Sequence, residues 1–449
     1  MKKKRMKTVM SIMIILMISL SATLVIKSGV IHGLSHPIDS AKQELEEKKK
    51  DEKTITGEII DSTGTVIAST DSIGGNRKYI DPYAYSSVVS YHSGGLEYIY
   101  YDELYGAGNK EYKDSNDETY YLGSDIHITI DHSLQKLSYD LISGQEDASI
   151  VVLDSTGRVK AMTSSNTFDI NTVEDDYSEI SSEEGSLMNP AKDYHLPCGS
   201  VLKPIIGQCL IERNADYTVF DKGSITLETG EVIRNAGSVA HGNLDLERAM
   251  KASSNVFFIS AGKYLGGRLL EEKYNMFKIG DSFNTDFGEI ASSKEPINND
   301  YDLAMNAIGQ HTYISTVHLA SIMQAITTGT MKQPYMVEKI VQDGKVVKRG
   351  ENTVLSDLSV SEETISHMNA ILAQCAASYG LSQETCGVNV LAKTGTAEVE
   401  TKEGPRTVAT LLIALPSQQY FIAIQSRNTE GKWGSDLSEI GASLIQYLR

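Results

Sequence analysis

Short runs of alternating apolar and polar residues at both ends of the chain predict paired β-strands. Ile126, Ile128 and Ile130 alternate with polar residues, a period of two that is typical of a strand with one buried face. Elsewhere, two β-prone runs lie on either side of a short turn containing glycine or proline, which predicts a hairpin. Such pairs span residues 55–68, 149–163, 336–348 and 407–426.

Apolar residues at helical spacing follow the first strands and continue through the middle of the chain. Leu134, Leu137 and Leu141 recur at this spacing behind Asp131, a residue type that commonly caps a helix. The apolar stretch 200–210 is also compatible with a helix. Strands at both ends with helices between them predict an α+β fold whose sheet joins segments that are distant in sequence.

The N-terminus has a different pattern. A basic segment, residues 1–7, precedes an uncharged run at residues 8–26, which is close to the ~20 residues that cross a bilayer as a helix. The flanking charges place residues 1–7 in the cytoplasm and the rest of the chain outside. A cleaved signal peptide with a small-residue site near Ser21 is the alternative. Apolar residues continue to Ile26 and favour a retained transmembrane anchor.

Charge distinguishes the next segment from the remainder. Residues 40–53 are mostly charged and lack an apolar stripe, so we interpret residues 27–53 as a solvated stalk or linker.

The chain has 449 residues, enough for a large core and an accessory domain. Its net charge is −18. Such an acidic chain argues against nucleic-acid binding, which requires clustered lysine and arginine.

Four cysteines are compatible with an extracytoplasmic location, where disulfides can form. Cys198 and Cys209 lie on one predicted helix, about 16 Å apart at 1.5 Å per residue, so they cannot pair with each other. Cys375 and Cys386 flank a short loop and either pair or remain buried free thiols. No cysteine or histidine spacing resembles a metal site.

The sequence PCGSVLKP places a candidate nucleophile and base at the start of the helix predicted for residues 200–210. Ser200 and Lys203 lie one turn apart, so their side chains project from the same face. Pro204 is tolerated because the first turn of a helix needs no N–H donor there. A lysine can deprotonate a serine when burial and nearby cations lower its pKa. This spacing alone is common and carries little specificity.

Two further segments supply polar groups of the same kind. Ser253 and Asn255 follow a short helical run, which predicts an interhelical loop. Lys393-Thr394-Gly395-Thr396 follows an apolar run and is interpreted as an exposed strand. Gly395 has no side chain that would hold a substrate's backbone away from this strand.

In this order, Ser200-x-x-Lys203, Ser253-x-Asn255 and Lys393-Thr394-Gly395-Thr396 resemble the three motifs of the penicillin-binding protein and serine β-lactamase superfamily. Other segments resemble the membrane-proximal module and the catalytic domain of class B, monofunctional penicillin-binding proteins. These are Ile59-Ile60-Asp61 with Gly64 and Ala68, Gly95-Leu96-Glu97, Leu104-Tyr105-Gly106, Ile128-Thr129-Ile130-Asp131 with Leu134-Gln135, and Ile308-Gly309-Gln310.

The resemblance implies two extracytoplasmic domains after the stalk. Residues 54–123 correspond to a small β-rich membrane-proximal module, and residues 124–449 correspond to the transpeptidase domain. That domain is expected to contain a central antiparallel sheet flanked by helices and a helical subdomain. Thr56 departs from the family pattern because an arginine usually opens the first module, and Cys198 lies in a segment that usually reads Pro-Gly-Ser.

The implied activity is that of a peptidoglycan D,D-transpeptidase. It would be anchored in the bacterial cell membrane and would cross-link stem peptides on the extracytoplasmic side. Ser200, deprotonated by Lys203, would form the acyl-enzyme, Ser253 would relay a proton, and Asn255 would hold a substrate amide. Lys393, Thr394 and Thr396 would bind the terminal carboxylate, and Gly395 would let the substrate's backbone approach the strand. The backbone N–H groups of Ser200 and Thr396 would form the oxyanion hole.

The resemblance implies no cofactor and no metal, and it makes β-lactams expected covalent inhibitors. A serine β-lactamase or D,D-carboxypeptidase is an alternative that differs in whether water resolves the acyl-enzyme, and a penicillin sensor or an inactive scaffold is another. The predicted anchor, stalk and module favour a cross-linking enzyme. The stretch between the predicted anchor and Asp125 has about 100 residues, too few for a glycosyltransferase domain. The resemblance therefore implies a polytopic SEDS-type glycosyltransferase as the membrane partner.

Overall fold

The structure is a computed structural model that describes residues 54–106, 110–182, 185–401, 404–428 and 433–449. The predicted cytoplasmic tail, transmembrane anchor and stalk fall in residues 1–53, outside the described residues. Within the described ranges, no helix is long and apolar enough to cross a membrane.

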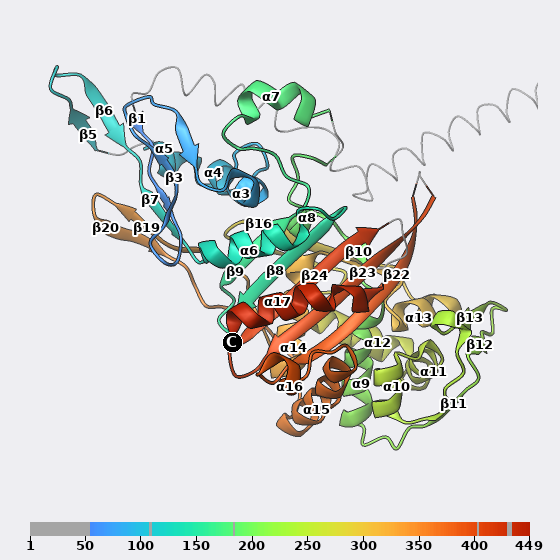
Figure 1. Ribbon diagram of the computed structural model, residues 1–449. Coiled ribbons are helices and arrows are strands. Elements are labelled where there is room, and N and C mark those ends of the chain that lie inside the picture. The colour runs from blue at the N-terminus through green and yellow to red at the C-terminus, as the bar shows by residue number, and fades with distance from the viewer. Residues whose placement is uncertain (1–53, 107–109, 183–184, 402–403, 429–432) are drawn as a thin grey trace, which may run out of the picture. The chain divides into compact units, whose positions relative to one another are not determined.

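A five-stranded antiparallel sheet lies at the centre of the C-terminal three-quarters of the chain (Figure 1). Its order is β22-β23-β24-β8-β9, so two early strands pair with three late ones. The predicted pairing of distant segments and the hairpins at 149–163 and 407–426 are therefore confirmed. The strands are β8 (Ala148–Asp154), β9 (Val159–Ser164), β22 (Leu391–Thr401), β23 (Gly404–Leu415) and β24 (Tyr420–Asn428).

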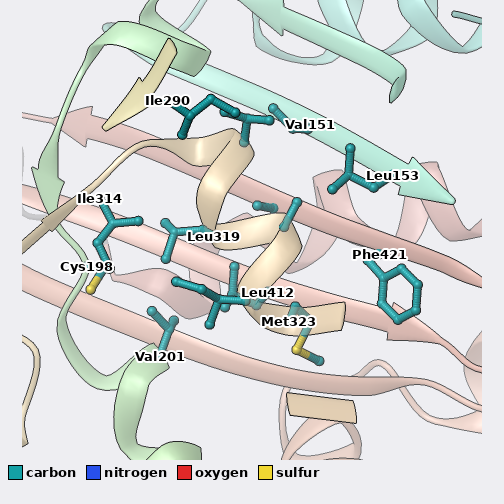
Figure 2. Packing of buried hydrophobic residues seen from close by; sticks show 14 of the residues in the cluster. Val151, Leu153, Cys198, Val201, Ile290, Ile314, Leu319, Met323, Leu412 and Phe421 are labelled. Carbon is teal, nitrogen blue, oxygen red and sulfur yellow. The ribbon is translucent and has the colours of Figure 1, made fainter. Parts of the chain in front are cut away.

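Both faces of this sheet are covered by helices, which explains the continuous apolar run in β23. On one face, Leu412 packs in the same cluster as Leu319 and Met323 of α14 (Figure 2). On the other face, Leu411 packs in a cluster with Leu134 of α6 and Leu444 of α17. The covering helices are α6 (His132–Ile142), α14 (Thr316–Thr328) and α17 (Ser438–Leu448).

Helices and small hairpins fill the segment between β9 and the last three strands. The helices are α7 (Val173–Ile180), α8 (Pro190–Asp193), α9 (Lys203–Glu212), α10 (Leu246–Ala252), α11 (Asn255–Leu265), α12 (Gly267–Met276), α13 (Asp300–Ala307), α15 (Glu362–Ser378) and α16 (Gln383–Cys386). The strands are β10 (Leu196–Pro197), β11 (Val219–Asp221), β12 (Ser224–Thr226), β13 (Val232–Arg234), β14 (Gly242–Leu244), β15 (Ser282–Thr285), β16 (Gly288–Lys294), β17 (Thr312–Ile314), β18 (Thr330–Lys332) and β21 (Val354–Asp357).

A six-stranded sheet of order β20-β19-β7-β2-β3-β4 contains strands from both sides of the predicted domain division at residue 123. Its strands are β2 (Ile59–Ile60), β3 (Val66–Thr70), β4 (Arg77–Tyr79), β7 (Asp125–Ile128), β19 (Val337–Gln342) and β20 (Lys345–Arg349). Because β7 pairs with both β2 and β19, residues 54–449 form one compact unit. The same N-terminal part also contains β1 (Thr54–Ile55), β5 (Glu111–Lys113), β6 (Thr119–Leu122), α3 (Pro82–Val89), α4 (Leu96–Ile99) and α5 (Tyr101–Tyr105).

The four cysteines are all buried and unpaired, so Cys375 and Cys386 do not form a disulfide. The interpretation that Cys198 and Cys209 share one helix is wrong, because Cys198 precedes a 3₁₀ turn, η1 (Gly199–Leu202), and α9 begins only at Lys203. Burial raises the pKa of Cys198 to about 12, so this thiol stays protonated at neutral pH.

A buried ion pair lies beside Thr56, the position where the family resemblance leads us to expect an arginine. Arg77 of β4 donates from Nε to Glu97 Oε1 over 2.7 Å and from a terminal nitrogen to the Gly57 carbonyl oxygen over 2.7 Å. The side chains of Arg77 and Glu97 are 10% and 3% exposed. Arg77 therefore supplies a guanidinium at this place from another strand.

We predict that Arg77→Ala lowers the free energy of unfolding by about 3–5 kcal/mol, because the buried Glu97 carboxylate keeps the Tyr79 hydroxyl but loses its positively charged partner. The matched control is Arg268→Ala, which breaks an exposed pair with Glu272 whose arginine is 93% exposed. That variant should lose about 0.5 kcal/mol or less. Urea unfolding of the full-length chain measures both, and equal losses in the two variants would contradict the buried pair.

Candidate active site

The predicted nucleophile and base lie at the junction of η1 and α9. Ser200 is in η1 and is partly exposed, whereas Lys203 is the first residue of α9 and is 0% exposed. Pro204 falls in the first turn of α9, where its missing N–H leaves no helical hydrogen bond unmade. The predicted one-turn separation of Ser200 and Lys203 is confirmed.

The Lys203 ammonium is buried among groups from the second motif. Its Nζ donates to the Ser253 carbonyl oxygen over 2.6 Å and to Asn255 Oδ1 over 2.8 Å, and it lies 3.4 Å from Ser253 Oγ. The ring of Phe258 is 5.5 Å away. Burial, and then the positive charge of Lys393, lower the pKa of Lys203 well below its usual value. Lowering of this kind is what a lysine needs to act as a base near neutral pH.

Ser253 links the two lysines of the motifs. It ends α10 in the left-handed region at φ 53, and Asn255 begins α11 after a connection of two residues. Lys393 Nζ donates to Ser253 Oγ over 3.1 Å, so this hydroxyl is within reach of both ammonium groups. A hydroxyl accepts two hydrogen bonds and donates one, and Ser253 is therefore equipped to transfer a proton.

Lys393 lies on β22, which is an edge strand of the five-stranded sheet. The interpretation of this motif as an exposed strand is wrong for Lys393, whose side chain is 0% exposed, although Thr394 and Thr396 are partly exposed. Lys393 Nζ also donates to the Thr394 carbonyl oxygen over 2.8 Å. The lysine thus points into the same buried site as Lys203, while the threonines remain accessible.

Gly395 is required by packing within the protein. A Cβ at this position would lie 2.4 Å from the Cys198 carbonyl oxygen, and one at Gly199 would lie 2.7 Å from the Thr396 carbonyl oxygen. On the other side, a Cβ at Gly434 would lie 2.4 Å from the Gly395 carbonyl oxygen. These distances are shorter than any Cβ contact tolerates, so the glycines allow η1 to pack directly against β22. The room that we predicted for a substrate backbone is occupied here by the turn that carries Ser200.

The three motifs meet in space, but not every expected contact is formed. Within the part of the chain that the structure describes, no hydrogen bond joins Ser200 Oγ to Lys203 Nζ, whose hydrogen bonds go to Ser253 and Asn255. Thr396 Oγ1 accepts a hydrogen bond from Gly434 N over 3.1 Å. Over the described ranges, no group of three or more histidine, cysteine or acidic residues could hold a metal ion.

Several residues of the site have no motif that would reveal them. Gly434, in η3 (Gly434–Leu437), packs on Gly395. Asp221, Asn235 and Ser254 form a buried polar group directly behind Ser253. Ser254 alone carried a detectable signal, because a serine before an apolar run is a typical helix cap. Asp221 ends β11 and Asn235 directly follows β13, positions where a polar residue is usually interpreted as part of a turn.

The family described as penicillin binding protein transpeptidase domain matches residues 148–440. The chain belongs to this family. Peptidoglycan D,D-transpeptidase MrdA of Escherichia coli K12 is 27% identical over 288 residues, which cover 56% of this chain and 45% of the relative. Penicillin-binding protein 3 of Bacillus subtilis 168 is 22% identical over 377 residues, which cover 78% and 56%. The chain spans about half the length of the curated relatives it matches.

Solved structures of penicillin-binding proteins share the fold. Penicillin-binding protein A from Mycobacterium tuberculosis, as its penicillin G acyl-enzyme complex, superposes with a TM-score of 0.77 at 20% identity, covering 88% of this chain and 100% of that one. Pseudomonas aeruginosa PBP2, in complex with WCK 5153, gives a TM-score of 0.73 at 20% identity, covering 88% and 96%. The mixed α and β fold implied by the sequence resemblance is therefore confirmed.

We predict that Gly395→Ala lowers the free energy of unfolding by about 1–3 kcal/mol, because its methyl group would displace η1 from β22. Gly144→Ala is the control, since a Cβ at Gly144 meets nothing within 4 Å and its backbone is not left-handed. Its effect should stay within about 0.5 kcal/mol. Thermal unfolding of both variants decides the matter, and a wild-type melting temperature for Gly395→Ala would refute the close packing.

Proposed function

We propose that the chain is a peptidoglycan D,D-transpeptidase that works through an acyl-enzyme on Ser200. One observation carries this proposal, which is the buried Lys203 ammonium held within 3.4 Å of Ser253 Oγ, itself 3.1 Å from Lys393 Nζ. A lysine of lowered pKa beside an accessible serine, with a second hydroxyl leading to a second lysine, supports acyl transfer with proton relay.

In the first half of the reaction, neutral Lys203 takes the proton of Ser200. The freed Oγ attacks the carbonyl carbon between the two terminal D-alanines of a stem peptide. The backbone N–H groups of Ser200 and Thr396 stabilise the oxygen that becomes negative in the tetrahedral intermediate. Collapse breaks the C–N bond, the leaving nitrogen receives a proton through Ser253, and D-alanine departs.

In the second half, an amine of a neighbouring stem peptide attacks the ester carbonyl of the acyl-enzyme. Its proton passes through Ser253 and Lys203 to Ser200 Oγ as the ester bond to that oxygen breaks. The new amide is the cross-link. A β-lactam acylates the same oxygen, but its leaving nitrogen stays tethered to the acyl group by the opened ring. We therefore propose β-lactams as covalent inhibitors of this chain.

Substrate binding falls to groups around the buried lysines. Lys393, Thr394 and Thr396 are proposed to bind the terminal carboxylate, with Gly395 between them. Asn255 is proposed to hold a substrate amide. Its Nδ2 already donates to the Arg234 carbonyl oxygen over 2.8 Å, and its Oδ1 accepts from Lys203. The second lone pair of Oδ1 remains available to accept a substrate N–H.

The family resemblance and the sequence pattern extend the proposal to the cell envelope. We propose a single-pass anchor at residues 8–26, a stalk at residues 27–53 and a membrane-proximal module at residues 54–123 that precedes the catalytic domain at residues 124–449. A polytopic SEDS-type glycosyltransferase is the proposed partner for glycan polymerisation. The apolar run, the basic N-terminus and the charged stalk support this topology.

The proposal predicts that a fluorescent penicillin labels the full-length chain covalently and that Ser200→Ala abolishes the label. Ser443→Ala, on α17, is the control and should be labelled like the wild type. Label that persists for many minutes, together with a new amide formed between a stem peptide and an acceptor amine as D-alanine is released, supports a transpeptidase. Rapid release with turnover of the antibiotic would indicate a hydrolase instead, and a folded chain that takes no label would refute the assignment of Ser200.

A second prediction concerns pH. Only neutral Lys203 is a base, and its pKa is lowered by burial and by Lys393, so the acylation rate should rise with pH around a midpoint well below 10.5. Lys393→Ala removes a positive charge that disfavours protonated Lys203, so it should move this rising limb to higher pH as well as reduce the rate. Acylation rates measured from pH 5 to 10 report both midpoints. A midpoint that stays in place in Lys393→Ala would show that the two ammonium groups do not interact.

A further inference from the structure

A buried carboxylate lies behind the catalytic loop and takes no direct part in the proposed reaction. Asp221, the last residue of β11, is 1% exposed. Its oxygens accept hydrogen bonds from Gly223 N over 2.7 Å, Asn235 Nδ2 over 2.7 Å and Ser254 Oγ over 2.7 Å. In the described portion of the chain no lysine or arginine forms an ion pair with it. A carboxylate buried in a protein needs such donors. Replacing Asp221 would therefore leave these three donors without their acceptor.

Two of these donors hold the beginning of α11. Ser254 Oγ accepts a hydrogen bond from Phe257 N over 3.0 Å, and Asn235 Oδ1 accepts one from Val256 N over 3.1 Å. The first N–H groups of a helix have no partner within the helix and depend on such acceptors. Asp221 orients both acceptors, because Ser254 donates to it through the same hydroxyl and Asn235 donates to it through Nδ2. The start of α11, and with it Asn255, is therefore held in place by Asp221 and Asn235, which come from earlier in the chain.

Ser253, the residue before this cap, is held in a costly conformation. Its φ of 53 lies in the left-handed region, which a helix end normally gives to glycine. A residue with a Cβ persists there only when its surroundings determine it. This conformation places the Ser253 carbonyl oxygen 2.6 Å from Lys203 Nζ and its hydroxyl 3.1 Å from Lys393 Nζ. Ser253 therefore reaches its proposed catalytic position only while the surrounding residues keep its backbone in the left-handed conformation.

We propose that Asp221, acting through Ser254 and Asn235, is a positioning residue for acylation and holds the Ser253–Asn255 loop against the two lysines. Asp221 touches neither substrate nor reacting atoms, so its effect appears in the rate through the geometry of the loop. The inference rests on the proposed function, because it assigns a role in the same acylation step. Without the carboxylate, Ser253 relaxes away from Lys203 and Lys393.

The test is Asp221→Asn in the full-length chain. This change keeps the size of the side chain but places an NH₂ group where three donors need acceptors, so at least one hydrogen bond is lost. We expect acylation by fluorescent penicillin to fall by about 10- to 100-fold, the loss typical of a displaced catalytic group. The rising limb of the pH profile should also move to higher pH, because a loosened loop admits water to Lys203 and weakens the burial that lowers its pKa.

Asp61→Asn is the matched control. Asp61 lies between β2 and β3, is 2% exposed, and accepts hydrogen bonds from the backbone N–H groups of Thr63, Thr65 and His132. It should lose thermal stability as Asp221→Asn does, yet keep the wild-type acylation rate and pH midpoint per folded molecule. Equal kinetic losses in the two variants would reduce Asp221 to a structural role and overturn the proposal.

Ser254→Ala provides a second route if Asp221→Asn fails to fold. It removes the hydroxyl that bonds Asp221 and accepts from Phe257 N, while the second link through Asn235 remains. We therefore expect a several-fold loss of acylation with the same direction of pH shift. Wild-type kinetics in either folded variant would overturn the positioning role. A wild-type chain that is never labelled would instead refute the proposed function itself, so the two failures are distinguishable.

Discussion

The direct contact between the η1 turn and the edge strand β22 is the constraint on which the site depends. Ser200 can lie beside Thr396 only because Gly199 and Gly395 present no side chain where the two backbones meet. Gly434 supports the strand from its other side. Backbone atoms thus set the separation between Ser200 and the strand, which makes this separation less dependent on side-chain rotamers than a contact through larger residues would be.

Electrostatic interactions around Lys203 are a second constraint on the site. Two lysines are fully buried around one serine hydroxyl, and the positive charge of Lys393 adds to the burial that lowers the pKa of Lys203. The hydrogen-bond acceptors around Lys203 come from the carbonyl of Ser253 and the amide of Asn255, which are neutral. A carboxylate in their place would hold the lysine protonated. The choice of neutral acceptors therefore keeps the base available while its nitrogen remains oriented.

Local spacing made the three motifs and four of the hairpins predictable from the sequence, because neighbours one turn or one hairpin apart are set by the chain itself. The same argument gave Asp131 as a helix cap, which the structure confirms. Asp221, Asn235 and the role of Gly395 could not be predicted, since their partners lie on other elements. Arg77 is a similar case, because the guanidinium beside Gly57 comes from a later strand than the resemblance suggested.

The strand order of the central sheet has a consequence for how the protein is made. β8 pairs with β24. The hairpin of β8 and β9, within residues 148–164, can therefore join the sheet only after β24, which ends at residue 428, has been synthesised. Contacts of such long sequence separation fold slowly, because a large loop must close before they form. A chain emerging from the ribosome therefore contains Ser200 long before the sheet that holds Lys393 is complete, and the three motifs come together only after β24 has been made.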